Sequence, residues 1–237
     1  MLYLGIKIRK KHFVKYSLEF LVIVLGVSVS FYFSELSKAA DLKDSSINVQ
    51  QSLLNEITEI EEYVKERENA FFSDTQTILT LQNKEIKSDS LRVLKGVAVT
   101  LFNYRGFSPP NSVYNSLVSD GNLGLIQSSE IKEELSKMHN QHFYHIKSNI
   151  DDENISKKKI VNYFQLNYPK FFLEGQFSKK SANYIIELKK IIDLELTLKS
   201  FIHEKRVAMT LKNGGLKKYK ESLNKIKNLL TENLLKP

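Results

Sequence analysis

The chain has 237 residues, of which 42% are hydrophobic and 26% charged, and it contains nine Gly, four Pro and no Cys. The absence of Cys excludes disulfides, thiolate metal sites and cysteine nucleophiles. So few Gly and Pro favour long helices over a β fold rich in turns.

The formal net charge of +8 is unevenly distributed. Residues 1–15 carry five bases and no acid, residues 35–89 carry twelve acids and six bases, and residues 206–237 carry eight bases and two acids. The positive charge is therefore divided between two distant segments, and neither an Arg cluster nor a recognition motif accompanies it. This distribution does not indicate a nucleic-acid partner.

Residues 16–34 are predicted to form a transmembrane helix. Glu19 is the only charged residue in this segment. The eighteen residues from Tyr16 to Phe33, at about 1.5 Å each in a helix, span about 27 Å, which is close to the roughly 30 Å thickness of the hydrocarbon core. The five bases all precede the span, so the positive-inside bias predicts that residues 1–15 form a cytoplasmic basic tail and that residues 35–237 are extracytoplasmic.

A cleaved signal peptide is the alternative interpretation of this segment. The uncharged run over residues 20–33 has a suitable length, and residues 37–39 have the small-x-small pattern of a cleavage site. The long basic segment before the run and the uninterrupted helical pattern after it favour an uncleaved anchor. Both interpretations give the same compartment for the rest of the chain.

One face of the predicted span carries small residues. Gly26, Ser30 and Ser34 follow one another every four residues, and Glu19 precedes Gly26 by seven residues, so all four lie on one side of a helix. Small residues allow a second helix to approach closely, which predicts binding of another copy or of another membrane protein. Glu19 also follows Lys15 by one turn and can pair with it. Alternatively, Glu19 takes part in proton coupling, as in a stator-like subunit.

The remainder of the chain is predicted to be all-α. Residues 35–82 contain no Pro or Gly and are predicted to continue the span as a long stalk helix, and residues 90–237 are predicted to form an antiparallel helical bundle outside the membrane. In the stalk, apolar residues recur with 3–4 spacing at Leu53, Ile57, Ile60, Val64, Phe71, Ile78 and Leu81.

Start and stop signals divide the bundle into shorter helices. Ser112 is expected to cap one helix, Ser128 or Ser129 the next, and Gly121 to supply a left-handed turn between them. Gly214-Gly215 is expected to end the penultimate helix. The predicted helices cover residues 90–103, 112–119, 129–168 with a possible break at 151–154, 181–213 and 216–235.

Two segments resemble an uncharacterised family of bacterial single-span membrane proteins. They are "KYSLEFLVIVLGVSVSF" and "VYNSLVSDGNLGLIQSSEIKEEL", and the second contains the family's Tyr-x-x-Leu-x-x-x-Gly-Asn-Leu-x-x-Ile stretch. The two segments cover about 40 residues. The resemblance implies a bacterial inner membrane and a helical domain, and it implies no activity. The matching positions are Glu19, Gly26, Tyr114, Leu117, Gly121, Asn122, Leu123 and Ile126.

His139, His142 and His145 are weak candidates for a metal site. Two histidines three residues apart on a helix can share a metal ion, but the outer two diverge by about 120°. No acidic residue lies within the cluster, and the zinc-protease pattern is absent. We therefore expect neither a metal nor another cofactor, with a metal-dependent enzyme or sensor as the alternative.

No catalytic motif is found in the chain. It has no nucleophile elbow, phosphate-binding glycine loop or dinucleotide fingerprint, so we expect a protein that is not an enzyme. An irregular segment carries residues that could line a groove, or that could instead fill the end of the bundle. These residues are Tyr104, Arg105, Phe107, Tyr114 and Asn122.

The basic C-terminal segment complements the acidic stalk. Residues 206–237 have a net charge of +6 and residues 35–89 a net charge of −6, so the two segments can pack together; contact with anionic lipid headgroups is the alternative. The sequence as a whole predicts a membrane-tethered scaffold or subunit of a membrane complex, which binds the bilayer and either itself or another membrane protein.

Overall fold

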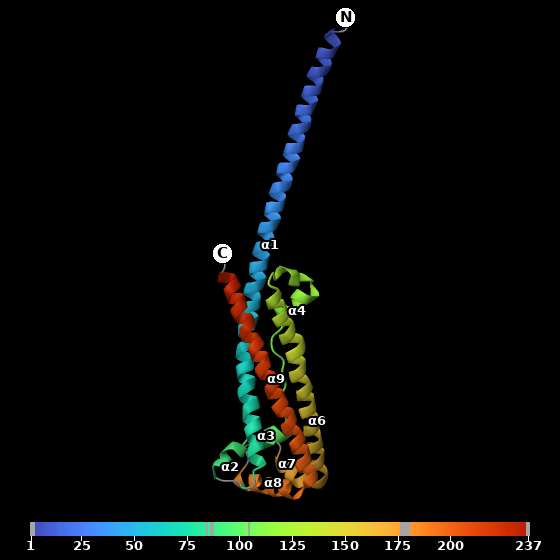
Figure 1. Cartoon of the computed structure of the whole chain (residues 1–237). Coiled ribbons are helices and arrows are strands. Elements are labelled where there is room, and N and C mark those ends of the chain that lie inside the picture. The colour runs from blue at the N-terminus through green and yellow to red at the C-terminus, as the bar shows by residue number, and fades with distance from the viewer. Residues whose placement is uncertain (1–2, 84, 86–87, 104, 176–180, 236–237) are drawn as a thin grey trace. The chain divides into compact units, whose positions relative to one another are not determined.

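The structure is a computed structural model that describes residues 3–83, 85, 88–103, 105–175 and 181–235 (Figure 1). All regular secondary structure in these residues is helical, which confirms the all-α prediction. The elements are α1 (Tyr3–Leu81), α2 (Ser88–Leu94), α3 (Val97–Phe102), α4 (Ser112–Ser119), the 3₁₀ turn η1 (Asn122–Leu125), α5 (Ser129–Ser136), the π-helical turn η2 (Lys137–His142), α6 (Phe143–Asn167), α7 (Pro169–Gly175), α8 (Ala182–Leu194) and α9 (Leu196–Leu235).

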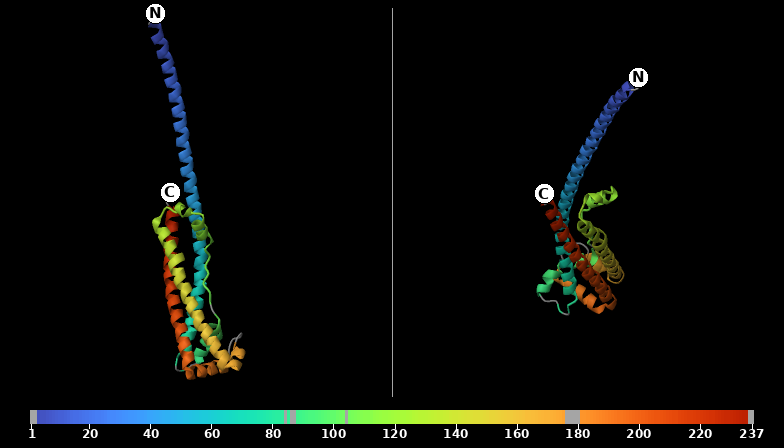
Figure 2. Two further views of the ribbon diagram at one scale, coloured as in Figure 1. Left: turned by 90° about the vertical axis from the view of Figure 1, so that its right-hand side faces the viewer. Right: turned by 45° about the horizontal axis from the view of Figure 1, so that its top comes forward.

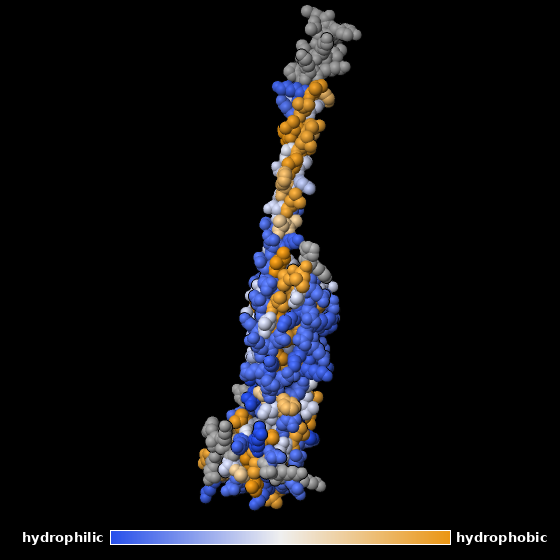
Figure 3. All heavy atoms as spheres, turned by 90° about the vertical axis from the view of Figure 1, so that its left-hand side faces the viewer, coloured by the Kyte–Doolittle hydropathy of each residue, from blue (hydrophilic) through white to orange (hydrophobic). Residues whose placement is uncertain are grey.

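The chain divides into two compact units, Met1–Gln50 and Gln51–Pro237. Helix α1 runs through both, so the division falls inside the segment predicted as the stalk. In the first unit every residue from Phe13 to Ser45 is exposed, and apolar residues dominate the first half of this stretch (Figure 3). The most apolar part has a mean hydropathy of 1.8, so this helix is long and apolar enough to cross a membrane.

Three long segments lie side by side in the second unit. They are the part of α1 after Gln50, α6 and α9, and α9 runs in the opposite direction to the other two (Figures 1 and 2). The seven apolar residues predicted from their 3–4 spacing form the core face of this part of α1. Each of the seven is at most 1% exposed: Leu53, Ile57, Ile60, Val64, Phe71, Ile78 and Leu81.

Short helices α2, α3, α7 and α8 close one end of the second unit (Figure 1). Aromatic rings pack at this end. Phe102 contacts Phe164 and Phe172 edge to face, with ring centroids 5.6 and 5.5 Å apart, and Phe171 stacks on Tyr184 at 4.3 Å. Such aromatic pairs contribute about 0.5–1.5 kcal/mol beyond the area that they bury.

The helix boundaries differ from those predicted at several places. The helix predicted over residues 90–103 is divided into α2 and α3 by a turn at Lys95 and Gly96. Helix α6 continues through residues 151–154, and the irregular part is the π-helical turn η2 instead. Pro169, directly after the predicted helix end at residue 168, begins the further helix α7, since a proline at the first helical position loses no intrahelical hydrogen bond.

Two of the three predicted signals around α4 are confirmed. The hydroxyl of Ser128 accepts a hydrogen bond from the Ile131 N–H at 3.3 Å and caps α5, and Gly121 adopts the left-handed conformation with a φ of 71°. The prediction for Ser112 was wrong, because this residue is the first of the helix and Asn111 occupies the cap position without a side-chain cap.

The prediction that Gly214-Gly215 ends a helix was also wrong, since α9 passes through both residues. Gly215 faces α6, and a β-carbon there would lie 2.9 Å from Cδ2 of His145 and 3.1 Å from Cγ1 of Ile146. The glycine therefore serves close helix packing. The break occurs instead at Glu195, between α8 and α9.

Glu195 lies at this break, and its side chain binds Tyr163 of α6 and Tyr168, the residue that follows α6. The hydroxyls of Tyr163 and Tyr168 both donate hydrogen bonds to the Glu195 carboxylate, each at 2.5 Å. These bonds lower the pKa of Glu195 and raise the pKa of both tyrosines, that of Tyr163 to about 12. The carboxylate is thus ionised and both phenols are protonated at neutral pH.

Candidate functional site

The predicted interaction face of α1 is exposed in the first unit. Nζ of Lys15 lies 3.8 Å from Oε1 of Glu19, so the predicted ion pair is present. The hydroxyl of Ser30 donates a hydrogen bond to the Gly26 carbonyl at 2.9 Å. A β-carbon added at Gly26 would meet nothing within 4 Å. Glu19, Gly26, Ser30 and Ser34 are all exposed. They form one surface of the helix that no described residue of the unit covers.

The three histidines lie in three different environments. The ring of His139 stacks on that of Tyr114, with centroids 3.9 Å apart and planes 5° apart. Burial lowers the pKa of His139 to about 4, so the ring is neutral at pH 7. Burial, followed by the charge of Lys218, lowers the pKa of His142, and His145 packs against Gly215. Within the described part of the chain, no group of three or more His, Cys, Asp or Glu is arranged to hold a metal ion.

The residues proposed for a groove lie in separate environments. Tyr104 is outside the described residues. Phe107 is buried and packs against the rings of Tyr63, Phe143 and Tyr219, whereas Asn122 is exposed. The structure therefore does not gather this set into a groove: Phe107 belongs to the core.

Arg105, from the same set, binds a buried acid of α1. Its Nε and Nη2 donate to the two oxygens of Asp74 at 2.6 and 3.3 Å, and the Thr100 hydroxyl donates to the same carboxylate at 3.1 Å. The hydrogen bond with Asp74 raises the pKa of Arg105. Asp74 interrupts the apolar face of α1, and this arrangement explains how it is accommodated there.

Another buried acid of α1 caps α4. Glu56 is 4% exposed, and its carboxylate accepts hydrogen bonds from the N–H groups of Val113 and Tyr114 at 2.8 and 3.1 Å. The first N–H groups of a helix have no intrahelical partner, and a negative charge there is favourable. This role was not predicted from the sequence, because the acceptor lies 57 residues before the first donor.

The basic segment of α9 packs against the acidic part of α1, as predicted. Nζ of Lys220 lies 2.6 Å from Oε2 of Glu68, and Nζ of Lys227 lies 2.5 Å from Oε2 of Glu61. All four side chains are more than one third exposed. Pairs of this kind contribute about 0–1 kcal/mol each, so they orient the helices more than they stabilise them.

A buried cluster of charges joins α6 to α9. Glu153 is 4% exposed and binds both Lys205, at 2.9 Å, and Lys212, and neither lysine is exposed to solvent. Nζ of Lys212 also lies 4.0 Å from the centre of the Phe71 ring. Burial alone would raise the pKa of Glu153, but the two lysines lower it; burial lowers the pKa of Lys212. One carboxylate thus serves two buried ammonium groups.

This cluster was not predicted from the sequence, although a signal for it was present. Lys205 and Lys212 are seven residues apart and occupy the apolar face of α9, between Ile202 and Leu216. Charged residues at core positions require buried partners. The pattern therefore indicates a buried ion pair, but it does not identify Glu153 as the acceptor.

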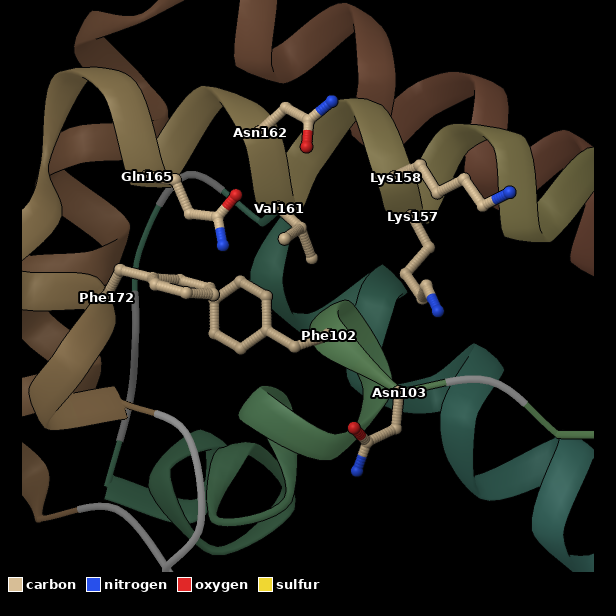
Figure 4. Close-up of a pocket in the computed structure, with 8 residues that line it drawn as sticks. All are labelled: Phe102, Asn103, Lys157, Lys158, Val161, Asn162, Gln165 and Phe172. Atoms are coloured by element: carbon tan, nitrogen blue, oxygen red, sulfur yellow. The ribbon is translucent and has the colours of Figure 1, made fainter.

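Cavities lined by described residues lie on the second unit, and two of them are well defined. One of about 350 Å³ follows α6 and α9 and is lined by the exposed apolar residues Ile155, Val207 and Leu211 beside the Lys159–Glu204 ion pair. The other has about 250 Å³ and lies where α6 meets the end of α3 and α7 (Figure 4). Neither cavity is lined by the groove residues or the histidines predicted from the sequence.

Comparisons with known proteins identify no relative of this chain. No family model, curated protein or solved structure matches the chain. The resemblance to a family of bacterial single-span membrane proteins stays a prediction.

Proposed function

We propose that the protein is a membrane-tethered helical subunit that crosses the bilayer once, through residues 16–34, and binds a second copy or another membrane protein. The observation that supports this proposal is the exposure of the apolar part of α1: every residue from Phe13 to Leu36 is uncovered in its unit. A surface of this kind is unstable in water and stable in lipid.

The balance of transfer free energies favours insertion. Eleven Leu, Ile, Val and Phe residues lie between Tyr16 and Phe33, and each contributes about 0.3–0.6 kcal/mol at the centre of a span, or about 3–7 kcal/mol together. One charged side chain costs about 2.5–3.5 kcal/mol at the centre and less near the membrane surface. Glu19 is in the first turn of the span and pairs with Lys15, so its cost lies below that limit.

The charge distribution supports an orientation. With the five bases of residues 1–15 in the cytoplasm, the second unit is a helical domain in the bacterial periplasm, held at the inner membrane by α1. The ion pairs from Lys220 and Lys227 to α1 support an assignment of the basic segment of α9 to packing within the bundle, not to lipid headgroups.

The face with Glu19, Gly26, Ser30 and Ser34 is the proposed site of contact with a partner helix. Interfaces between helices in membranes are rich in small residues because the two backbones must approach closely. The open space around Gly26 favours this face, since a partner can occupy it without displacing any described residue of this chain.

Replacement of Gly26 by Leu tests the proposal. The leucine has free space in the isolated chain, so any effect reports on a partner. We expect Gly26→Leu to weaken association by about 1–2 kcal/mol, which is about five- to thirty-fold, measured by crosslinking in native membranes.

Val27→Leu is the matched control, because Val27 is half exposed on the neighbouring side of the helix. This variant should crosslink like the unmodified protein. Equal crosslinking by Gly26→Leu, Val27→Leu and the unmodified chain would reject the contact face. Recovery of the protein in the soluble fraction after cell lysis would reject the membrane anchor itself.

A further inference from the structure

Exposed apolar residues recur on one side of α6 and on one side of α9. Ile155 and Leu166 are eleven residues apart on α6, and Leu196 and Val207 are eleven residues apart on α9. Eleven residues make three helical turns with a drift of about 20°, so the members of each pair lie on the same side of their helix. Each of the four residues is at least 44% exposed.

This side of both helices points away from the core of the second unit. Glu153 and Lys205, which are buried and bind each other, precede Ile155 and Val207 by two residues. Two residues turn a helix by about 200°, so the apolar residues lie on the opposite side from this buried pair. Ile155 and Val207 line the larger cavity, which is open between α6 and α9.

An ion pair on the same side shows which residues of the two helices lie at the same height. Nζ of Lys159 is 2.7 Å from Oε2 of Glu204, and both side chains are more than one third exposed. Helices α6 and α9 run in opposite directions (Figures 1 and 2). Ile155, four residues before Lys159, is therefore level with Val207, three residues after Glu204. The other two apolar residues are level with each other on the far side of the ion pair. The α6–α9 face is defined as Ile155, Lys159, Leu166, Leu196, Glu204 and Val207.

The α6–α9 face is complementary to itself. A twofold axis parallel to the helices would place α6 of one copy beside α9 of the other copy at unchanged heights. Lys159 of each copy would then face Glu204 of the other, which gives four alternating charges, and each apolar level would meet the same apolar level. A surface for an unrelated partner does not require this match between its own two helices, so the match favours a second copy as the occupant.

An acid sets one end of this contact. Asp152 is seven residues before Lys159 and is therefore level with Leu211, seven residues after Glu204. A carboxylate that faced a leucine of the second copy would lose water without gaining a partner. The contact therefore covers about 17 Å of α6, from Ile155 to Leu166. A contact this short is weak in solution, but two copies anchored in one membrane meet at a high effective concentration.

We propose that the α6–α9 face binds the same face of a second copy, so that α6 and α9 of both copies form four helices around a twofold axis. Neighbouring helices are antiparallel in this arrangement, as in many four-helix bundles. The inference rests on the proposed function, because that function places both anchors in one membrane. The contact is separate from the face of α1 with Gly26, since it joins the second units.

Single cysteines test the contact, because the chain contains none. Ile155→Cys and Leu166→Cys should each give a dimer with a short bis-maleimide in isolated native membranes, since each residue faces its own copy near the axis. Val118→Cys, at an exposed position of α4, should give at least tenfold less dimer. Copies related by an axis across the helices at Ile155 would place the two Leu166 residues about 33 Å apart. A dimer with Ile155→Cys alone would therefore overturn the proposed axis.

Two further changes in the Leu166→Cys chain test the chemistry of the contact. Val207→Glu should lower the dimer yield at least fivefold, whereas Val118→Glu, at a similarly exposed valine, should leave it within twofold. Lys159→Glu should lower the yield at least threefold, and Lys159→Glu combined with Glu204→Lys should restore it to within twofold. Equal yields from the two valine variants, or no recovery in the double variant, would overturn the proposal.

The outcomes separate this contact from the proposed function. Absence of the dimer with both Ile155→Cys and Leu166→Cys, while Gly26→Leu still weakens crosslinking, would overturn the α6–α9 contact and leave the span contact intact. A crosslinked product that contains a different protein would assign the face to that partner and overturn the second copy. A dimer through Leu166→Cys that persists with Gly26→Leu would support the α6–α9 contact even where the span contact fails.

Discussion

A β-carbon at Gly215 of α9 would lie 2.9 Å from Cδ2 of His145 on α6 and 3.1 Å from Cγ1 of Ile146. Two helices can approach this closely only where one of them lacks a side chain. The His145 ring is exposed and can move away, but Ile146 is fully buried and cannot. The contact therefore determines how deeply α9 packs against α6.

Alanine at the two neighbouring glycines should have opposite effects. A β-carbon added at Gly214 would meet nothing within 4 Å, so Gly214→Ala should stabilise the protein by about 0.5–1 kcal/mol through helix propensity. Gly215→Ala gains the same propensity but is overpacked, which typically costs about 1–3 kcal/mol. Urea unfolding of the full chain in mild detergent should separate the two variants by that amount, and equal stabilities would show that the close contact has no energetic consequence.

Neutralising Glu153 should destabilise the second unit strongly. Glu153→Gln leaves two buried ammonium groups without a carboxylate, and removal of one partner from a buried ion pair costs about 3–5 kcal/mol. Glu204→Gln is the control, because its pair with Lys159 is more than one third exposed and contributes about 0–1 kcal/mol. The free energy of unfolding in urea measures both. A loss below about 1 kcal/mol for Glu153→Gln would mean that water or another acid compensates the lysines.

The core face of α1 could be predicted because its spacing is a local property. Seven apolar residues with 3–4 spacing determine which side of the helix is buried, whatever packs against it. The turn at Gly121 and the cap at Ser128 were predictable for the same reason, since the groups that interact are within a few residues of one another.

The remaining features depend on residues far apart in the chain. Gly214-Gly215 has the composition of a helix end, but packing against α6 overrides that propensity. Glu56 caps α4 from another helix, and the partner of Lys205 and Lys212 comes from α6. The smaller cavity is formed by three separate elements, so no pattern along α6 alone indicates it.

The stacked histidine should make stability depend on pH. The pKa of His139 is about 4 in the folded chain and about 6.5 in an unfolded one, so the unfolded state binds more protons between these values. The stability is therefore fully present above pH 6.5 and is lost as the pH falls through 4. Between pH 7 and 5.5 the loss should be about 1 kcal/mol.

Phenylalanine at this position provides the control. His139→Phe keeps a ring on Tyr114 but removes the proton, so its free energy of unfolding should vary less with pH over the same interval. The interval stays above the range in which Glu134 and Glu153 titrate, since the pKa of each is lowered in the folded chain. Identical pH profiles for the variant and the unmodified protein would contradict the assignment to His139.

The orientation of the span can be measured with single cysteines, because the chain contains none. Ser45→Cys, at an exposed position of α1, should react in intact spheroplasts with a maleimide that does not cross membranes. Gly5→Cys should react only after the membrane is permeabilised. The reverse labelling pattern would overturn the proposed orientation, and a chain that begins near Ala40 would establish a cleaved signal peptide.

Glu19→Gln distinguishes an ion pair near the membrane surface from a proton-coupling group. The Lys15–Glu19 contact of 3.8 Å is exposed on both sides, and an anchor needs the charge of Glu19 only to balance Lys15. The variant should therefore insert, crosslink and restore the phenotype of a deletion strain as the unmodified gene does. Glu19→Lys is the contrasting change, because it places two cations in the first turn of the span and should reduce the amount of inserted protein.

A stator-like subunit would behave differently with Glu19→Gln: insertion and crosslinking would be normal, while the phenotype that depends on the proton gradient would be lost. That combination would replace the scaffold proposal with proton coupling, because assembly without function is the expected result of removing an acid that carries protons.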